Sequence, residues 1–453
     1  MYVRRTLLAS AIAMAFAMPA QADNSDDIAA IRKEIEAMRQ NYEARIQALE
    51  AQLKQAERHT SQAKADAAEP TAADHATPPA AANSFNPEIG LILTGRYANL
   101  KDVPNRHITG FLPLGPAAAG MRRGFTADAS ELSLAADIDP DFRGQANLVY
   151  EDGTGATVEE AYFQTLSLGS GFTLKGGRFR SAIGYMNEQH PHAWDFVDNP
   201  LMYQALFGEG YGQDGVQLKW LAPTDLLVEL TGELGRGADF PGSDRNKNGA
   251  GDATLGLHLG GDVGLSNSWR GGIAYLRTRA ENRAFFGLDP AGTALTGDFT
   301  GRSRTWLADF IWKWTPNGNP RETNFKFQTE WFQRSESGSL ACTRCIASPY
   351  ASEQSGWYAQ SVYQFMPMWR IGYRYDRLDR GTARLDGADI GSTIASLADY
   401  SPSRHSLMLD WSPSEFSLVR LQYARDKSMA GLAENQVALQ YVYSLGAHGA
   451  HKY

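Results

Sequence analysis

The sequence is short of cysteine, of long apolar runs and of positive charge. Its only cysteines are Cys342 and Cys345. After residue 22 no segment offers the roughly 18 to 20 unbroken apolar residues of a membrane-spanning helix, so we expect none there. There are 43 Lys and Arg residues against 51 Asp and Glu, a net charge of −8. A nucleic-acid partner is not expected, because binding to phosphates requires clustered basic residues.

Residues 1–22 have the organisation of a signal peptide for export. Arg4 and Arg5 precede the apolar stretch LLASAIAMAFAM, and AQA supplies a cleavage site at the end of the segment. Exported proteins enter an oxidising compartment. Cys342 and Cys345 are therefore expected to form a small disulfide loop, with metal binding by the two thiols as the alternative.

Residues 23–59 carry a heptad pattern of apolar side chains, with one extra four-residue step that would locally relax a supercoil. The apolar stripe is narrower than that of a helix packed on its own domain, so we expect a short α-helical coiled coil that mediates self-association. Residues 60–84 are rich in Ala and Pro and lack an apolar period. They are expected to form a flexible linker.

From about residue 88 the apolar residues recur at every second position, as in VALQYVYS. One face of each segment is apolar and aromatic, whereas the other carries charge. The pattern predicts an all-β domain over 85–453, a 16-stranded antiparallel transmembrane β-barrel with its apolar face towards lipid and its charged face towards a lumen. The predicted strands are 88–97, 129–138, 142–151, 156–166, 171–180, 213–220, 224–235, 254–263, 268–279, 304–314, 322–334, 355–365, 368–378, 404–412, 415–425 and 435–445.

The connections between these segments alternate in length. Those after even-numbered strands are short, whereas those after odd-numbered strands are mostly long. A soluble β-sandwich, the alternative fold, has no reason to alternate in this way, whereas outer-membrane barrels have short periplasmic turns and long outer loops. If the short turns are periplasmic, the first strand starts in the periplasm, and the coiled coil that precedes it lies there too. The long connections are 98–128, 181–212, 236–253, 280–303, 335–354 and 379–403.

A signal peptide, a coiled coil, an Ala/Pro linker and a sixteen-strand barrel together resemble the phosphate-selective porin O/P family. The local match is LKGGRFRSAIGY, in which Gly177, Arg178, Phe179 and Gly184 occupy the pattern positions. The resemblance implies a trimeric outer-membrane channel for small solutes or ions, in contact with outer-membrane lipid and lipopolysaccharide. Some relatives are described as zinc-regulated outer-membrane receptors.

Strand parity predicts which charged side chains face the lumen. The two signs nearly balance, so phosphate selectivity is not expected of this chain. The main lumen-lining candidates are Arg96, Lys326, Glu330, Arg370, Arg374 and Asp376. Further candidates on the same faces are Lys219, Lys313, Arg420, Glu131, Asp137, Glu151, Glu229, Asp309 and Asp410.

The pair Gly176-Gly177 affects whether the side chains of Arg178 and Arg180 face the lipid or the lumen. Strict alternation would place both arginines on the lipid side, where a cation at mid-bilayer costs about 2 to 4 kcal/mol. A β-bulge at the two glycines would turn Phe179 outwards and both arginines into the lumen. Alternatively, the arginines lie beyond the membrane rim.

The connection 181–212 contains NEQHPHAWDFVDNPL. Third outer loops of sixteen-strand porins commonly fold inwards, and the resemblance implies the same here. The loop would then narrow the lumen and select what passes. The predicted constriction comprises Glu188, His190, His192, Asp195, Asp198, Arg178 and Arg180. His190 and His192 are also candidate Zn²⁺ ligands, and a purely structural loop is the third possibility. We expect no other cofactor.

Two other functions are disfavoured, and a third stays open as an alternative. Catalysis would need a nucleophile, base and acid together, and Ser406 and His405 are neighbours in sequence only. A receptor with a plug domain would need 22 strands, more than this chain provides. An adhesin or structural anchor remains possible, and a test for ion conduction separates it from a porin.

Overall fold

The computed structural model describes residues 87–112, 120–151, 155–208 and 210–446. All described residues belong to one compact unit, Ser84–Tyr453. The predicted signal peptide and coiled coil, and the linker predicted over 60–84, lie outside the described residues.

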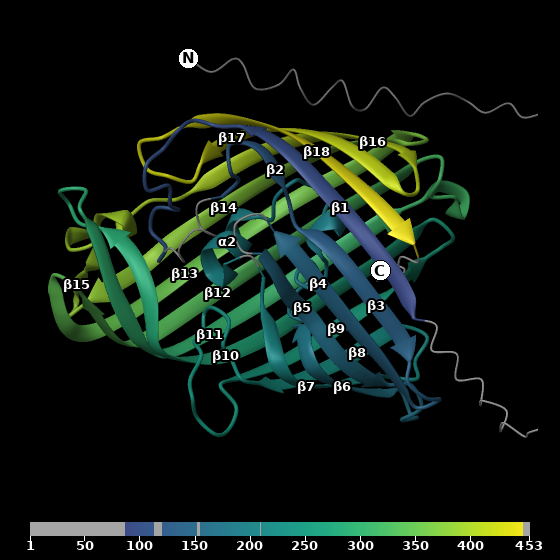
Figure 1. Cartoon of the computed structure of the whole chain (residues 1–453), viewed down its shortest axis with the longest axis horizontal. Helices are drawn as coiled ribbons and strands as arrows, with labels where there is room; N and C mark the ends of the chain where they lie inside the picture. Colours follow the sequence, from purple (N-terminus) through teal and green to yellow (C-terminus); the bar gives the residue numbers. More distant parts are fainter. Residues whose placement is uncertain (1–86, 113–119, 152–154, 209, 447–453) are drawn as a thin grey trace, which may run out of the picture. The chain divides into compact units, whose positions relative to one another are not determined.

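The described residues form one antiparallel sheet that closes into a barrel (Figure 1). β1 (Glu88–Asn99) pairs with β18 (Glu434–Gly446) on one side and with β2 (Gly124–Ala127) and β3 (Ser130–Asp137) on the other. β2 and β3 are two parts of one interrupted strand, and β15 (Ala388–Asp389) is a short addition to a hairpin. Over the described ranges the wall therefore has the predicted 16 strands.

Each predicted strand overlaps one strand of the wall. The others are β4 (Phe142–Glu151), β5 (Gly155–Thr165), β6 (Phe172–Arg180), β7 (Gly212–Leu221), β8 (Leu227–Gly235), β9 (Asp252–Val263), β10 (Asn267–Leu288), β11 (Ala294–Trp314), β12 (Asn324–Cys342), β13 (Cys345–Met366), β14 (Trp369–Leu385), β16 (Ser403–Ser414) and β17 (Ser417–Lys427).

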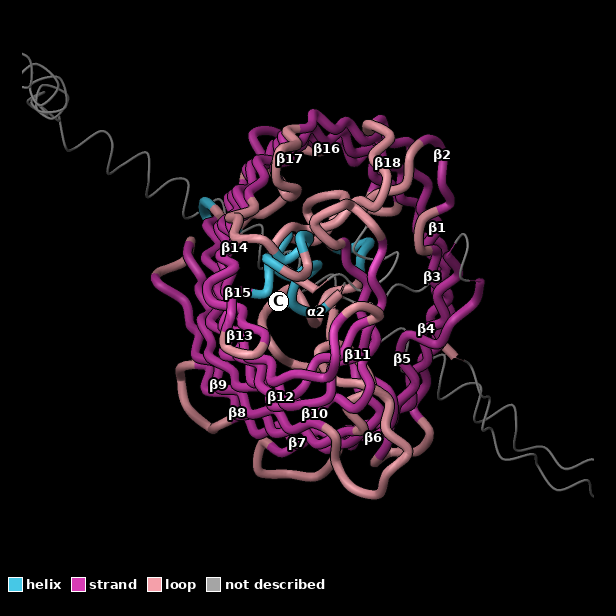
Figure 2. The backbone as a smooth tube through the Cα atoms, turned by 90° about the vertical axis from the view of Figure 1, so that its left-hand side faces the viewer, coloured by secondary structure: helices cyan, strands magenta, loops and turns pink. Residues whose placement is uncertain are grey.

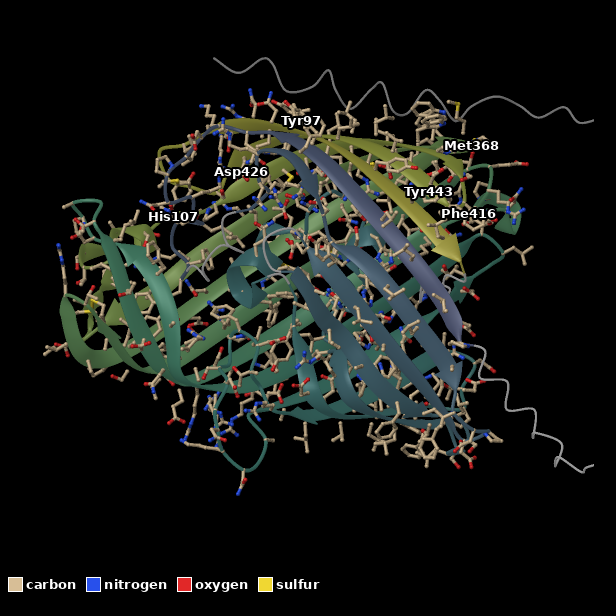
Figure 3. The ribbon with its side chains drawn as sticks, viewed as in Figure 1. Tyr97, His107, Met368, Phe416, Asp426 and Tyr443 are labelled. Atoms are coloured by element: carbon tan, nitrogen blue, oxygen red, sulfur yellow. A yellow bond between two sulfur atoms is a disulfide. The ribbon has the colours of Figure 1, made fainter. Side chains whose placement is uncertain are left out.

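The two faces of the wall differ as the alternation predicts. In β16 the side chains of Leu409 and Trp411 are exposed on the outward face, whereas Met408 and Asp410 are buried inside. The short turns gather at one end, where Figure 3 places Met368 and Phe416. No helix among the described residues is long and apolar enough to cross a bilayer.

Two of the predicted long loops, 280–303 and 335–354, are instead the ends of long hairpins, and this part of the prediction is wrong. Only residues 289–293 separate β10 from β11, and only 343–344 separate β12 from β13, where Cys342 and Cys345 are joined by a disulfide. β10 has 22 residues, about twice the 9 to 11 needed to cross a bilayer. Few of the outward positions there are large and apolar, as expected for strand ends that leave the lipid, so the alternation is weak in the sequence.

The predicted β-bulge at Gly176-Gly177 is also wrong. β6 pairs with β7 without a register shift, Phe179 is fully buried, and Arg178 lies on the outward face with its side chain 48% exposed, paired with Asp214. The glycines instead allow a close approach of the neighbouring strand. A Cβ at Gly177 would lie 2.3 Å from the carbonyl oxygen of Ala161.

A register shift lies in the neighbouring strand, β5. Asn147 pairs with Glu160 and Leu148 pairs with Val158, which leaves Glu159 as the extra residue of a bulge. Two adjacent carboxylates, Glu159 and Glu160, therefore both reach the inside of the barrel.

The inside of the barrel contains an apolar core. The connection between β6 and β7 folds into the ring of strands and includes α2 (Leu201–Phe207), whose residues are all buried (Figure 2). The rings of Tyr203 and Phe207 pack edge-on against Phe332 of β12, with centroids 4.8 and 5.3 Å away. Ile108 and Phe111, which follow β1, join the same cluster. Part of the lumen is therefore filled by folded chain.

Candidate functional site

The inward loop begins at Gly184, which lies too close to the wall for any residue with a side chain. The backbone N–H groups of Tyr185 and Met186 donate to the carboxylate of Glu330 on β12. Gly184 has a φ of +74°, and a Cβ there would lie 2.9 Å from that carboxylate and 3.0 Å from the hydroxyl of Tyr203. Only a residue without a side chain allows the loop to approach this closely.

The wall holds the rest of the loop mainly through its backbone. The N–H of Leu201 donates to Asp376 at 3.0 Å, and the N–H of Val197 donates to Gln422 at 2.8 Å. Arg334 donates to the carbonyl oxygen of Leu206 at 3.0 Å. Because these are buried bonds to strand side chains, the loop is fixed inside the barrel.

Asp195 of the loop lies between cations of the wall. Lys326 forms an ion pair with its carboxylate, and Arg370 contacts the other oxygen at 3.2 Å. Burial raises the pKa of Asp195, but Lys326 and Arg370 outweigh burial and lower it to about 2. The carboxylate is therefore charged and neutralised by the wall.

Asp198 is held in the same way from strands further round the barrel. Arg374 contacts its carboxylate at 2.9 Å and Arg404 at 2.7 Å. Burial raises the pKa of Asp198, but the two arginines outweigh it and the pKa is lowered. The predicted lumen-facing residues Lys326, Arg370 and Arg374 thus contact the loop.

His190 lies against three carboxylates of the opposite wall. Its Nδ1 is 3.1 Å from Glu131 and 2.9 Å from Glu159, and its Nε2 is 2.9 Å from Glu160. Burial alone lowers the pKa of His190, but the hydrogen bonds with these glutamates raise it well above its ordinary value. The imidazole is therefore a cation that ties the loop to β3 and β5.

The neighbours of His190 complete this cluster. His192 stacks on it with ring centroids 5.7 Å apart, and its Nδ1 is 3.3 Å from Glu131. Arg180 pairs with Glu159, and its backbone N–H donates to Glu160 at 2.9 Å. Single ligand atoms of Glu131, Glu159 and His190 all lie within 4.8 Å of one another, a grouping that fits a metal ion.

The structure separates the predicted constriction residues into four places. Arg178 is outside the barrel, as described above. Glu188 lies 3.7 Å from Arg270 of β10. The remaining residues lie between the loop and the wall in two groups, which are Arg180, His190 and His192 on one side and Asp195 and Asp198 on the other.

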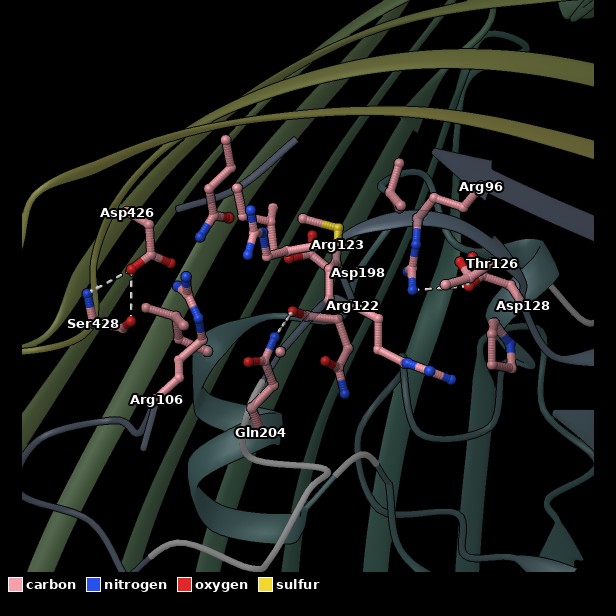
Figure 4. Close-up of a pocket in the computed structure, with 18 of the residues that line it drawn as sticks. Arg96, Arg106, Arg122, Arg123, Thr126, Asp128, Asp198, Gln204, Asp426 and Ser428 are labelled. Atoms are coloured by element: carbon pink, nitrogen blue, oxygen red, sulfur yellow. Dashed lines mark hydrogen bonds and ion pairs between the residues drawn. The ribbon is translucent and has the colours of Figure 1, made fainter. Parts of the chain in front are cut away.

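A cavity of about 1120 Å³ remains beside the loop, lined in part by β1 and by the segment that follows it. Figure 4 shows its arginines and carboxylates together. Arg96 pairs with Asp128 at 2.8 Å, and Arg106 pairs with Glu434. Asp198 and His192 of the loop face the same cavity. Its lining therefore carries both signs of charge.

Two parts of this site were not predicted from the sequence. The segment 100–112 was predicted only as a loop, although it folds inwards and the N–H of Gly110 donates to the backbone of Ser396 at 2.8 Å. Glu159 and Glu160 were not selected. Adjacent glutamates in a strand were a usable signal, because one of them must face lipid unless a bulge turns both inside.

Solved structures of similar barrels share little sequence identity with this chain. A loop-deletion mutant of OmpT of Vibrio cholerae is 12% identical, with a TM-score of 0.49, covering 80% of this chain and 99% of that one. The outer membrane channel DcaP of Acinetobacter baumannii is 12% identical, with a TM-score of 0.48 over 80% and 97%. An anion-selective porin from Comamonas acidovorans is 11% identical, with a TM-score of 0.46 over 80% and 99%.

The family of the chain is shown by a relative of similar sequence. No family model matches the chain. An uncharacterized protein of Aquifex aeolicus (strain VF5) is 32% identical over 352 residues, which cover 73% of this chain and 71% of that protein. The chain belongs to the same family as this Aquifex aeolicus protein.

Proposed function

We propose that the protein is an outer-membrane porin that passes small hydrophilic solutes or ions by passive diffusion. The observation that carries this proposal is a closed barrel with an apolar outward face, whose inside holds an anchored loop beside a cavity of about 1120 Å³. A purely structural anchor would not need a cavity of this size with charged residues in its lining.

Loop 181–212 is proposed to set the selectivity of the passage. Its acidic residues are bound to wall cations, so the loop contributes little free charge to the passage. The cavity lining carries arginines such as Arg96 and Arg106 together with Asp128 and Glu159. We therefore propose a passage that selects mainly by size, and we do not extend to it the phosphate selectivity of the porin O/P family that the sequence resembles.

A catalytic function is not proposed. His405 is exposed on the outward face of β16, whereas the neighbouring Ser406 is buried inside the barrel. The two side chains point to opposite sides of the wall and cannot act on one substrate.

Self-association is proposed from the heptad pattern over 23–59, and its form as a homotrimer is proposed from the resemblance to the porin O/P family. Chemical crosslinking of the full chain and of a chain lacking residues 23–59 tests it. A trimer that depends on this segment is expected, and equal crosslinking of both proteins would contradict a role for it.

Single-channel recording in a planar bilayer tests the porin proposal. The purified protein is expected to produce discrete conductance steps, and a salt gradient gives the sign of any selectivity from the reversal potential. Complete absence of steps from folded protein would overturn the proposal and favour an anchor.

As a second function, we propose that the cluster of Glu131, Glu159 and His190 binds a divalent cation such as Zn²⁺. Carboxylate and imidazole are suitable ligands for that ion, and their ligand atoms already lie within 4.8 Å of one another. A bound cation would take the place of the proton on His190 and would tie the loop to β3 and β5.

Calorimetry with Zn²⁺ tests the second function. The wild type is expected to bind, whereas the double variant His190→Ala and His192→Ala should not. Glu188→Gln is the matched control, because Glu188 belongs to the same loop but lies near Arg270. Identical traces for the wild type and the double variant would remove the proposal.

A further inference from the structure

Four arginines gather on the outward face of two neighbouring strands. Arg277 and Arg279 belong to β10, and Arg302 and Arg304 belong to β11. Arg277 lies directly opposite Arg304, and Arg279 lies directly opposite Arg302. Side chains at such positions have Cβ atoms about 4.5 to 5.5 Å apart. We call these four residues the arginine quartet.

The quartet has no counter-charge of its own. Within the ranges 87–112, 120–151, 155–208 and 210–446, none of its guanidinium groups has a hydrogen bond or an ion pair. The strand positions on either side are Ala253, Ser335 and Ser337, which are uncharged. Glu281, further along β10, is already paired with Lys247 at 2.5 Å.

This arrangement is unfavourable without a ligand. Like charges directly opposite each other in a sheet repel, and two cross-strand pairs side by side add to that repulsion. The inward neighbours of these residues give no relief, because Thr278, Ser303 and Thr305 are buried on the other face. An anion that contacts several guanidinium groups would convert the repulsion into attraction.

The height of the quartet on the barrel indicates where that anion comes from. The next outward pair towards the short turns is Tyr275 and Trp306, whose ring centroids are 4.7 Å apart. Further towards the short turns, Ile273 and Phe310 continue the apolar outward surface. Aromatic side chains of transmembrane barrels lie at the membrane interface. The quartet therefore begins where the lipid tails end, on the side of the long connections.

We propose that the arginine quartet binds the phosphate groups of a lipid of the outer leaflet, a phosphorylated glycolipid of the lipopolysaccharide type. Guanidinium groups form paired hydrogen bonds with phosphate oxygens, which lysine cannot reproduce. The inference rests on the proposed outer-membrane location, but it does not depend on conduction through the lumen.

A lipid-binding measurement on purified full-length protein tests this inference. The variant with Arg277→Gln, Arg279→Gln, Arg302→Gln and Arg304→Gln is compared with the wild type for retention of lipopolysaccharide in detergent. The variant is expected to bind at least about tenfold more weakly, because several charge-assisted hydrogen bonds are lost. The matched control is Arg143→Gln with Arg321→Gln, which removes charge near the short turns and should bind as the wild type does.

Two further binding measurements identify the group of the lipid that the arginine quartet recognises. Enzymatically dephosphorylated lipopolysaccharide should bind the wild type as weakly as the intact lipid binds the quartet variant. Millimolar inorganic phosphate should not displace the lipid, because it lacks the acyl chains beside Tyr275 and Trp306. Displacement by free phosphate, or equal binding of the two lipids, would overturn the proposal.

The remaining outcomes separate this inference from its alternatives. If the quartet variant retains the lipid but changes its oligomeric state, the quartet is an interface between copies of this chain and the proposal is wrong. Conductance of the quartet variant should equal that of the wild type, because the residues lie outside the lumen. A wild type that binds lipid through the quartet but does not conduct would refute the porin function and leave the lipid site standing.

Discussion

At the residue scale, Asp195 and Asp198 each bind two cations of the wall, and these cations differ in their burial. Asp195 contacts Lys326 and Arg370, and Arg370 also pairs with Asp410 at 2.5 Å. Asp198 contacts two arginines, Arg374 and Arg404, which are almost completely buried. The side chains of Lys326 and Arg370 are 19% and 28% exposed, whereas those of Arg374 and Arg404 are 0% and 4% exposed. Loss of the Asp198 carboxylate therefore takes a charged acceptor from donors that water does not reach.

We therefore predict that Asp198→Asn lowers the free energy of unfolding by about 1 to 3 kcal/mol, because buried donors lose a charged acceptor. Denaturant unfolding in detergent measures the change. Glu188→Gln, on the same loop, should change stability by less than about 0.5 kcal/mol. Equal losses in the two variants would contradict a special role for the Asp198 ion pairs.

The pH dependence of the loop follows from the same carboxylates. The pKa of Asp195 is lowered in the folded protein to about 2, and that of Asp198 is lowered as well. Their contribution to stability is therefore complete above the unfolded pKa of about 4 and is lost as the pH falls through the folded pKa values.

The predicted result is a stable open-channel current from neutral pH to about pH 4, and noisy current with loop movement below it. Conductance recordings between pH 7 and pH 2 measure the effect. In Asp195→Asn with Asp198→Asn, the noise should already be present at pH 7. A wild-type transition near neutral pH would show that other groups control the loop.

At the scale of elements, the bulge in β5 can be tested by deletion of single residues. Deletion of Glu159 removes the extra residue and restores regular pairing between Val158, Glu160 and their partners in β4. Deletion of Tyr162, in the regular part of the strand, instead moves one part of β5 to the opposite face. We predict that the first variant folds into a barrel and the second does not.

Heat-modifiable mobility in electrophoresis measures barrel formation after refolding in detergent. The Glu159 deletion should keep the mobility shift of the wild type, although Arg180 loses its ion-pair partner. The same loss of shift in both deletions would mean that the extra residue is required for the strand to pair.

The elements also show how far the sequence could predict this fold and this site. The strand number and the short turns were predictable, because each strand crosses a bilayer that demands apolar residues at alternate positions. The extensions of β10 to β13 were not predictable from the sequence. Outward residues there, such as Arg302 and Ser337, lie outside the bilayer and therefore need not be apolar. The contacts of Asp195 and His190 depend on strands far apart in the sequence, so the loop pattern alone could not identify their partners.

At the scale of the whole molecule, the loop and the barrel share one apolar core. Phe332 and Tyr358 of the wall pack with Tyr203 and Phe207 of the loop in one cluster. A barrel whose lumen contained only water would not place such residues inside. The loop therefore contributes to the core of the barrel, and the space open inside the barrel is what the loop leaves.

We predict that replacement of residues 186–208 by a short Gly/Ser linker increases single-channel conductance several-fold, because the obstruction is removed and the polar wall becomes accessible. The same replacement should lower the unfolding temperature, since Phe332 and its neighbours lose their apolar partners and become exposed to water. The two effects together distinguish a loop that narrows the lumen from one that only stabilises the barrel.

Shortening of the β12–β13 hairpin by removal of residues 337–348 is the control for this prediction. That hairpin tip extends the wall beyond the membrane crossing and includes the disulfide between Cys342 and Cys345. Its removal should change conductance little, because it lies outside the narrow region. If hairpin shortening raised conductance as much as loop replacement did, the constriction would lie at the outer mouth, and loop 181–212 would have only a structural role.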